Sequence, residues 1–420
     1  MTRRRPALAC APVLLAWQAA ALAPSVGPGA GLGLPTERCG NSDLQSKDLD
    51  ILMYGVTGYI GTVAAFYLAR EHRENPRWAI AARNAEKLRS LSDSIRQATD
   101  RPPMESIRLL LGDDEETLWR TVRRARTVIN FAGPYEPSNG EALIRAALTG
   151  CAHYVDLASE MVWRAQMIAK YEQTAEWRGL AVVQGAGFAS LAGDFLATAA
   201  VQDAIKQGAP PPTAVRVVWS RLNGAFSGGR IAAGHYEDMH HGLVTDPYIL
   251  APKAAAHQRV DTVVDGMGAA RYDQNQLQMS RLSATDCPTI RRSLTAMLPG
   301  AAISVQMADV PTLASSVREF LGTNVSERLA DPPPGKGPPL WELTNGGFQG
   351  AAVTFSNRTR TKVVLKGRGD PHCLGSAKMS VELALGLAQN GPEDKRGGFL
   401  TPALALGLQQ LEYRLQAQGE

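Results

Sequence analysis

The chain has 420 residues, of which 45% are hydrophobic and 20% are charged. This apolar content is enough for a packed core and excludes a disordered chain. The formal net charge of +4 is too small to indicate nucleic-acid binding, so we expect no nucleic-acid partner. Five cysteines exclude a disulfide-rich scaffold, and because none forms a CxxC pair we expect no metal site.

The first 45 residues have the composition of a targeting segment. Arg3 to Arg5 precede an uncharged run from Ala7 to Ala23 that ends in small residues, which is the layout of a secretory signal. No acidic residue occurs before Glu37, which also suits an organelle presequence, and the run is marginal as a membrane span. The stretch Pro24 to Pro35 is typical of a linker. We therefore predict a targeting or anchor segment plus linker over 1–45, with the destination open between an organelle and a membrane, and a disordered tail as the alternative.

From residue 46 onwards, short apolar runs alternate with segments of helical spacing. The predicted strands are Leu49–Tyr54, Trp78–Ala82, Ile107–Leu111, Thr127–Phe131, His153–Leu157 and Leu180–Gln184. The predicted helices are Tyr59–Arg70, a helix capped by Asn84 that runs through Gln97, one opened by Asp113 and Asp114, Glu141–Leu148 and Glu160–Arg178. This alternation predicts an α/β domain with a Rossmann-type doubly wound parallel sheet over residues 46–206.

The character of the chain changes at the proline-rich run Gln207–Pro212. We predict a second, α+β domain for substrate binding or dimerisation over 207–370, and C-terminal helices over 371–420. The second domain is expected to contain strands at Val215–Leu222 and Lys362–Lys366, a helix at Ser315–Leu321 and a loop at Asp331–Pro339. In the tail, two apolar stripes each follow one helical face: Ala377, Val381, Leu385 and Ala388, and then Leu404, Leu408, Leu411 and Leu415. Because such stripes need a partner, we expect the C-terminal helices to return to the first domain.

A glycine motif joins the first strand to the first helix. Gly55, Gly58 and Gly61 are spaced three residues apart, where glycine permits a tight turn, close approach to a pyrophosphate, and close packing of helix on strand. The start of a helix also offers free N–H groups and a positive dipole end to phosphates. Placed after the first strand of an alternating series, the motif predicts dinucleotide binding by the glycines together with Thr57, Tyr59 and Ile60.

The end of the second strand indicates which dinucleotide is bound. Folds that bind NAD usually place an acid here, but this strand ends Ile80-Ala81-Ala82-Arg83. The guanidinium of Arg83 can bind a 2′-phosphate, with Lys87 one helical turn further on. NADP(H) is therefore the predicted cofactor, unless Arg83 is only a solvated charge.

Candidate catalytic residues follow the later strands, where doubly wound sheets bind their ligands. No tyrosine has a lysine four positions later, and no Gly-x-Ser-x-Gly elbow occurs. After the fourth strand, Ala132, Gly133 and Pro134 are predicted to complete the cofactor site. We predict Tyr135, Asp156 and Glu160 as catalytic residues near the nicotinamide. The alternative is that Asp156 and Glu160 only cap the next helix.

Five pieces of the first domain resemble the saccharopine dehydrogenase-like oxidoreductases, in particular their trans-acting enoyl reductase branch. They are Gly55–Gly61, Trp78–Arg83, Asn130–Tyr135, His153–Glu160 and Gly185–Asp194. Ser227-Gly228-Gly229, Gly367–Pro371 and Gly397–Ala403 are similar too. The resemblance implies an NADP-dependent oxidoreductase of lipid or glycolipid metabolism that reduces an activated C=C. It leaves association with a membrane or lipid droplet, and a homodimer, open.

The chain departs from this family's pattern at Ala189, where one of two usual acids is missing and only Asp194 survives, and at Ser159. In an enoyl reductase, Tyr135 would donate a hydrogen bond to the developing enolate, and Asp156 or Glu160 would relay a proton.

Two alternatives to enoyl reduction stay open. A saccharopine-type amino-acid dehydrogenase would need a cluster of cationic side chains, for which Arg216, Arg221 and Arg230 are available. The other alternative is a non-catalytic nucleotide-binding protein associated with lipid or membrane.

Overall fold

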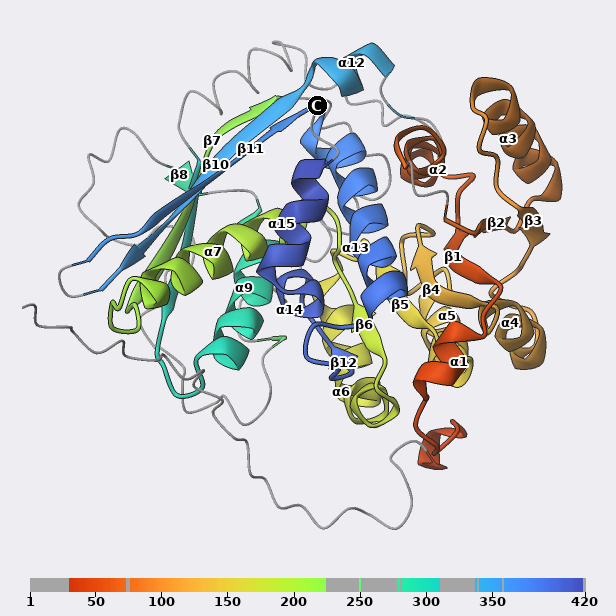
Figure 1. Ribbon diagram of the computed structural model, residues 1–420, viewed down its shortest axis with the longest axis horizontal. Helices are drawn as coiled ribbons and strands as arrows, with labels where there is room; N and C mark the ends of the chain where they lie inside the picture. Colours follow the sequence, from red (N-terminus) through yellow and green to blue (C-terminus); the bar gives the residue numbers. More distant parts are fainter. Residues whose placement is uncertain are drawn as a thin grey trace, which may run out of the picture.

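The computed structural model describes residues 30–72, 76–223, 249–250, 278–279, 282–309, 337, 340–356 and 359–417. In this part of the chain, two β-sheets flank a central group of helices (Figure 1). The predicted helix Ser315–Leu321, the Ser227-Gly228-Gly229 element, Arg230 and all of the predicted loop Asp331–Pro339 except Gly337 lie outside the described residues.

The first sheet has seven strands, all parallel to their neighbours, in the order β12-β6-β5-β4-β1-β2-β3. The strands are β1 (Leu49–Tyr54), β2 (Trp78–Ala82), β3 (Glu105–Arg108), β4 (Ala125–Asn130), β5 (His153–Asp156), β6 (Ala181–Val183) and β12 (Gly398–Phe399). The order reverses between β1 and β4, which is the switch point of a doubly wound sheet. The predicted Rossmann-type fold is confirmed.

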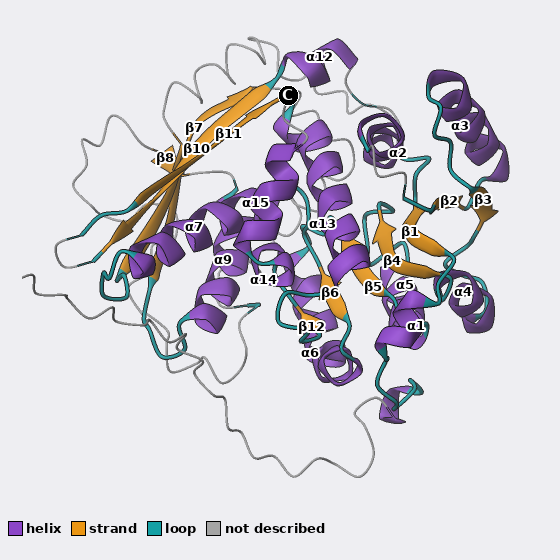
Figure 2. Ribbon diagram, viewed as in Figure 1, coloured by secondary structure: helices purple, strands orange, loops and turns teal. Residues whose placement is uncertain are grey.

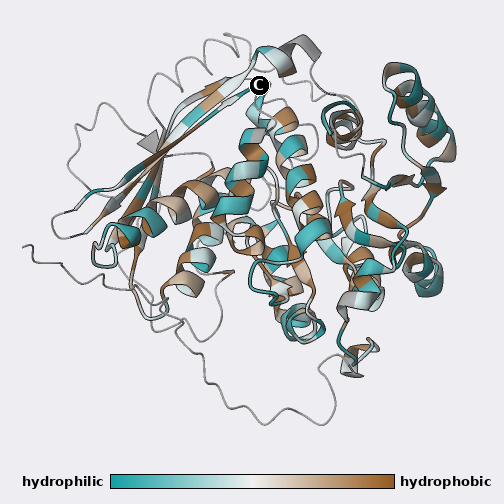
Figure 3. Ribbon diagram, in the orientation of Figure 1, coloured by the Kyte–Doolittle hydropathy of each residue, from teal (hydrophilic) through white to brown (hydrophobic). Residues whose placement is uncertain are grey.

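Helices cover both faces of this sheet (Figure 2). They are α2 (Tyr59–Glu71), α3 (Ala85–Ala98), α4 (Glu115–Val122), α5 (Gly140–Thr149) and α6 (Met161–Arg178). Alternate residues of β1 enter different cores: Ile51 and Met53 pack with α2 and α3, whereas Leu52 packs with α4, α5 and α6. Burial on both sides explains why the central strands are nearly continuous apolar runs, which are brown in Figure 3.

Two helix starts follow the predicted capping chemistry. The Asn84 side chain accepts a hydrogen bond from the Lys87 backbone N–H at 2.9 Å, and Asp114 accepts one from Thr117 N–H at 2.8 Å. The third strand lies nearer the N-terminus than the predicted Ile107–Leu111. It is an edge strand, and it ends where Arg108 pairs with Ala82, the last residue of β2.

The second sheet is mixed, in the order β11-β10-β7-β9-β8. Its strands are β7 (Ala214–Asn223), β8 (Gln278–Met279), β9 (Ser304–Asp309), β10 (Gly347–Phe355) and β11 (Lys362–Arg368). The sequence predicted β7 and β11, but β9, β10, α9 (Ser283–Met297) and the short α12 (Leu340–Asn345) were missed. Helix α7 (Phe188–Lys206) packs on this sheet and on α9, although our predicted boundary assigned it to the first domain.

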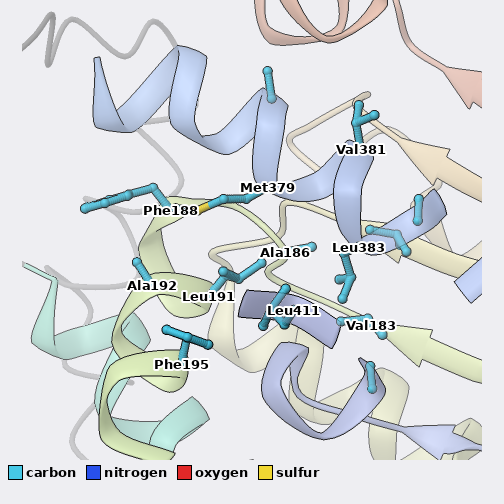
Figure 4. Close-up of a cluster of buried hydrophobic side chains, with 14 of the residues drawn as sticks. Val183, Ala186, Phe188, Leu191, Ala192, Phe195, Met379, Val381, Leu383 and Leu411 are labelled. Carbon is cyan, nitrogen blue, oxygen red and sulfur yellow. The ribbon is translucent and has the colours of Figure 1, made fainter. Parts of the chain in front are cut away.

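The C-terminal segment returns to the first domain, as predicted. After η4 (Pro371–Gly375), α13 (Ser376–Asn390) packs against α2, β4 and β5. Figure 4 shows Met379 of this helix beside Phe188 of α7, and Leu383 pointing toward Val183 of β6. The second predicted stripe is not one helix. Gly407, at φ +69°, separates α14 (Pro402–Leu406) from α15 (Leu408–Ala417).

The predicted N-terminal linker is partly wrong, because its end is attached to the first domain. Beyond the short turn η1 (Ala30–Leu32), Leu34 is buried, and Cys39 forms a disulfide with Cys151 ahead of α1 (Asn41–Gln45). This is one tie rather than a disulfide-rich scaffold. Among the described helices, none is long and apolar enough to span a bilayer.

Candidate functional site

The glycine loop between β1 and α2 brings three backbone segments into close contact. Gly55 has φ +79°, and a Cβ there would lie 2.7 Å from the Ala132 nitrogen at the end of β4. A Cβ on Gly61 would lie 2.7 Å from the Gly55 carbonyl oxygen. Glycine is therefore required at both positions, and the turn lies at the crevice where the strand order reverses.

The first turn of α2 fits the pyrophosphate of a dinucleotide. Its N-cap is Gly58, which has no side chain to cover the backbone N–H groups, so these groups can bind phosphate oxygens. The turn itself is held by Gly58 N–H, which donates to the Gly55 carbonyl at 3.0 Å, and by the Thr62 hydroxyl, which donates to the Val56 carbonyl at 2.9 Å. Thr57, Tyr59 and Ile60 are half-buried around it.

The two cations that the sequence predicts for the 2′-phosphate of NADP lie after β2 and at the start of α3. Arg83 and Lys87 are both exposed, one directly after β2 and the other in the first turn of α3. The burial of Tyr54 raises the pKa of its hydroxyl, and the nearby positive charge of Arg83 opposes this shift. Arg83 therefore lies near the end of β1 as well as that of β2.

The turn after β4 forms the other wall of the crevice. Ala132 N–H donates to the Asn130 side chain at 3.0 Å, and the peptide bond between Gly133 and Pro134 is cis. Ala132, Gly133 and Pro134 are half-buried, so they can line a cofactor as the sequence predicted.

The hydroxyl of Tyr135 is engaged within the protein. It donates to the Asn130 carbonyl and accepts from Leu157 N–H, both at 3.0 Å, and the residue is only 4% exposed. Its ring stacks on Trp163. This geometry argues against our hypothesis that Tyr135 donates directly to substrate. The residue instead fixes the end of β4 against the end of β5.

Glu160 braces the same turns. Its carboxylate accepts hydrogen bonds from Tyr135 N–H at 2.9 Å and from Ser159 N–H at 3.0 Å. Glu160 directly precedes α6, but its carboxylate also binds the turn after β4. Capping of α6 therefore does not by itself describe its role. Glu160 is a positioning residue in this arrangement.

Asp156 is fully buried at the end of β5. Its Oδ1 accepts from Ala158 N–H at 2.9 Å and from Gly185 N–H at 3.1 Å, so it joins the turns after β5 and β6. Burial raises the pKa of this carboxyl to about 7, with the two backbone hydrogen bonds opposing the shift. Asp156 is therefore a buried carboxyl at the end of β5 with a pKa near neutrality.

A buried polar cluster that the sequence did not reveal lies behind the turn after β6. Arg164 of α6 is 2% exposed and donates to the Ser190 hydroxyl at 3.2 Å and to Thr289 of α9 at 3.3 Å. The backbone N–H of Ser190, a residue with φ +84°, donates to Asp286 at 2.6 Å. Ser190 and Arg164 lie 96 and 125 positions from their partners on α9, so no local pattern could have found the cluster.

Asp194, the acid that survives from the family pattern, is structural. It accepts from the Ser293 hydroxyl at 2.5 Å and from Ala403 N–H at 3.0 Å, which ties α7 to α9 and to the start of α14. Its carboxylate is fully buried, away from the glycine loop. The departure at Ala189 therefore leaves this tie intact.

The fold and the crevice define a dinucleotide-binding oxidoreductase. Residues 51–183 match the family model described as the saccharopine dehydrogenase NADP binding domain. The predicted cofactor, NADP(H), and the predicted class, an NADP-dependent oxidoreductase, are thereby confirmed.

Curated relatives match far more than this domain. A Mycobacterium tuberculosis protein provisionally named a trans-acting enoyl reductase is 27% identical over 414 residues, covering 89% of this chain and 96% of that protein. A Mycobacterium bovis protein named trans-acting enoyl reductase is 24% identical over 408 residues, covering 86% and 94%. A Caenorhabditis elegans protein named lipid droplet localized protein is 34% identical over 149 residues, covering 35% and 34%. The resemblance to the saccharopine dehydrogenase-like oxidoreductases and their enoyl reductase branch is confirmed.

Proposed function

We propose that this oxidoreductase uses NADPH to reduce an activated C=C in a lipid-like substrate. The observation that carries the proposal is the similarity to proteins named trans-acting enoyl reductases across 86–89% of this chain, which includes the second sheet as well as the nucleotide domain. The crevice between the ends of β1 and β4 supports the proposal that the cofactor binds there. Gly55, Gly58, Gly61 and Arg83 are the residues on which cofactor binding would depend most.

Within this proposal, Asp156 stores the proton that the α-carbon of the substrate receives. Its pKa near 7 means that the carboxyl is substantially protonated at neutral pH. Tyr135 and Glu160 position the turns around it rather than contacting the substrate. The Rossmann-type domain would hold the cofactor, and the second sheet with α7 and α9 would hold the substrate or a second copy of the chain.

The test is a kinetic one. Purified enzyme is incubated with NADPH and a series of α,β-unsaturated acyl thioesters of increasing chain length, and the loss of NADPH absorbance is followed. Turnover should fall as pH rises above about 7, because Asp156 loses its proton there. Asp156→Asn should lower turnover and remove this pH limb while sparing NADPH affinity. Asp93→Asn serves as the matched control, because Asp93 is exposed on α3 and pairs with Arg96 at the surface.

Other outcomes would contradict the proposal. Turnover of saccharopine, or of lysine with 2-oxoglutarate, without enoyl reduction would favour the amino-acid dehydrogenase. The geometry gives that alternative little support, because the Arg216 guanidinium donates to Gln306 at 2.7 and 3.0 Å. NADPH binding without turnover of any of these substrates would favour a non-catalytic role.

The cellular place of the reaction is part of the proposal. The relative named lipid droplet localized protein matches 35% of this chain, and it supports association with a lipid surface. The signal-like residues 1–29 would direct the chain to that membrane or organelle. Imaging of the full chain and of a version lacking residues 1–29 tests this, and identical distribution of the two would contradict it.

A further inference from the structure

A short N-terminal segment lies against the C-terminal end of α6 and the turn before β5, away from the glycine loop. We call residues 34–45 the N-terminal strap. The Cys39–Cys151 disulfide joins it covalently to the turn between α5 and β5, across 112 positions of sequence. Cys39 and Cys151 are both half-buried, so a small reductant can reach the bridge, whereas the free thiols of Cys287 and Cys373 are buried.

The C-terminal end of α6 holds the strap on its other side. Arg178 donates to the Pro35 carbonyl at 3.0 Å and to the Glu37 carbonyl at 2.7 Å, and its own carbonyl accepts from Cys39 N–H. Trp177 donates to the Thr36 carbonyl at 2.6 Å. Two adjacent residues and one disulfide therefore supply the recorded polar attachment of residues 35–39.

The same arginine touches the disulfide. The second terminal nitrogen of Arg178, Nη2, lies 3.0 Å from Cys151 Sγ, and the side chain is 3% exposed. A guanidinium beside a sulfur favours the thiolate over the thiol, so Cys151 is the better leaving group when the bridge is attacked. The arrangement thus gives the two sulfurs different roles.

We propose that Cys39–Cys151 is a thiol–disulfide exchange site at which a dithiol reductant releases the N-terminal strap from the NADP-binding domain. A thiolate of the reductant attacks Cys39 Sγ, the S–S bond breaks, and the electron pair leaves on Cys151 Sγ next to Arg178. The second thiol of the reductant then displaces Cys39. The protein disulfide gains two electrons and one proton, which leaves Cys39 as a thiol and Cys151 as a thiolate. The dithiol becomes a disulfide and releases its other proton to solvent.

Release of the strap has a defined consequence. Once the covalent tie is lost, residues 35–39 are held by the hydrogen bonds that Trp177 and Arg178 make to them. The strap precedes β1 in the chain, so the redox state would decide whether residues 34–39 are held covalently against the end of α5 or only by hydrogen bonds. The cofactor crevice lies at the opposite ends of the strands, and its affinity for NADPH should not change.

The experiment uses the full-length chain and dithiothreitol as the probe. Thiols are alkylated without denaturant and located by mass spectrometry, and tryptic cleavage after Arg38 is timed. Before reduction, Cys39 and Cys151 should resist alkylation. Afterwards both should be alkylated, and cleavage should accelerate about tenfold, since loss of the tie allows local opening. NADPH affinity should stay within about twofold of its starting value.

Two variants separate the role of Arg178 from simple loosening of the strap. Arg178→Gln should speed cleavage after Arg38 but slow reduction by dithiothreitol, because the leaving thiolate loses its positive neighbour. Arg145→Gln, which removes a hydrogen bond to the Leu32 carbonyl without touching the sulfurs, should leave the rate of reduction unchanged. If Arg178→Gln speeds both processes, Arg178 has no part in the exchange and the proposal is wrong.

Other results would overturn the proposal outright. One is alkylation of Cys39 and Cys151 before any reductant is added. Another is reduction that leaves the cleavage rate after Arg38 unchanged. A third is alkylation of the buried Cys287 and Cys373 on reduction, because that would mean that the whole domain unfolds.

Discussion

The carboxyl ends of the strands in the first sheet differ between two regions, one around β1 and β4 and one around β6. Around β1 and β4, the walls are backbone and glycine, half-buried, with the exposed cation Arg83 beside them. Around β6, the edge is closed by buried side chains, with Arg164, Asp286 and Asp194 all at most 2% exposed. The first end is suited to receive a ligand, and the second holds the two sheets together.

This difference also separates the roles of acidic residues. Asp194 and Asp286 belong to the closed end, where hydrogen bonds between α7, α9 and α14 use them. Asp156 lies between the glycine-walled end and the closed end of this edge. It is the last residue of β5, which pairs with β4, and it accepts hydrogen bonds from the turns after β5 and β6. The variants below should therefore divide into those that lose the cofactor and those that lose stability.

The largest effect is expected at the open end. Gly55→Ala should weaken NADPH binding about 1,000-fold, or ~4 kcal/mol. The new Cβ would clash with the backbone after β4, and residue 55 itself has the left-handed φ of +79° that alanine disfavours. Gly179→Ala is the matched control. It has φ +74° but nothing within 4 Å of the added Cβ, so it should cost about 1 kcal/mol of stability and spare binding. Equal losses of binding in both variants would contradict the assignment.

The closed end should respond in stability instead. Asp194→Ala removes the acceptor of the Ser293 hydroxyl and of Ala403 N–H inside the core. We expect a loss of ~3 kcal/mol in the free energy of unfolding, measured by denaturant titration. NADPH affinity of the folded protein should not change. A stable variant with lost binding would place Asp194 in the cofactor site.

Asp286 should make stability depend on pH. Burial raises its pKa from 3.8 to about 7, so the folded state keeps a proton that the unfolded state has lost between these values. The stabilising contribution is complete below pH 3.8 and disappears as pH rises through about 7. Asp286→Asn should therefore flatten this decline by up to about 1.4 kcal/mol per pH unit. An unchanged slope of unfolding free energy against pH would show that Asp286 does not titrate in this range.

The smallest effect is expected at the boundary between the two ends. Tyr135→Phe removes the hydrogen bonds to the Asn130 carbonyl and from Leu157 N–H, which should cost ~1 kcal/mol of stability. Turnover should fall only slightly, because Tyr135 positions the turns without donating to substrate. A fall of 100-fold or more at unchanged stability would restore Tyr135 as a catalytic donor.

The open end was predictable from sequence because its chemistry is local. Gly55 to Gly61 and Arg83 each follow a strand by one or a few residues, and the strand pattern places them at one edge. The closed end was not predictable, because Ser190 and Asp286 are 96 positions apart and only the folded chain brings them together. Tyr135 follows β4 by a few residues, as the strand pattern indicates, but nothing in the sequence could show that its hydroxyl bonds Asn130 and Leu157.

The measurement that tests the account most directly is a fluorescence titration of the purified chain with NADPH and with NADH, repeated with Arg83→Ala and with the exposed control Arg89→Ala. We predict that the unmodified chain binds NADPH more tightly than NADH. Arg83→Ala should weaken it about 10- to 100-fold, the value of a lost charge-assisted hydrogen bond, and leave NADH and the control unchanged. Failure to bind either nucleotide would contradict the assignment as an NADP-dependent oxidoreductase.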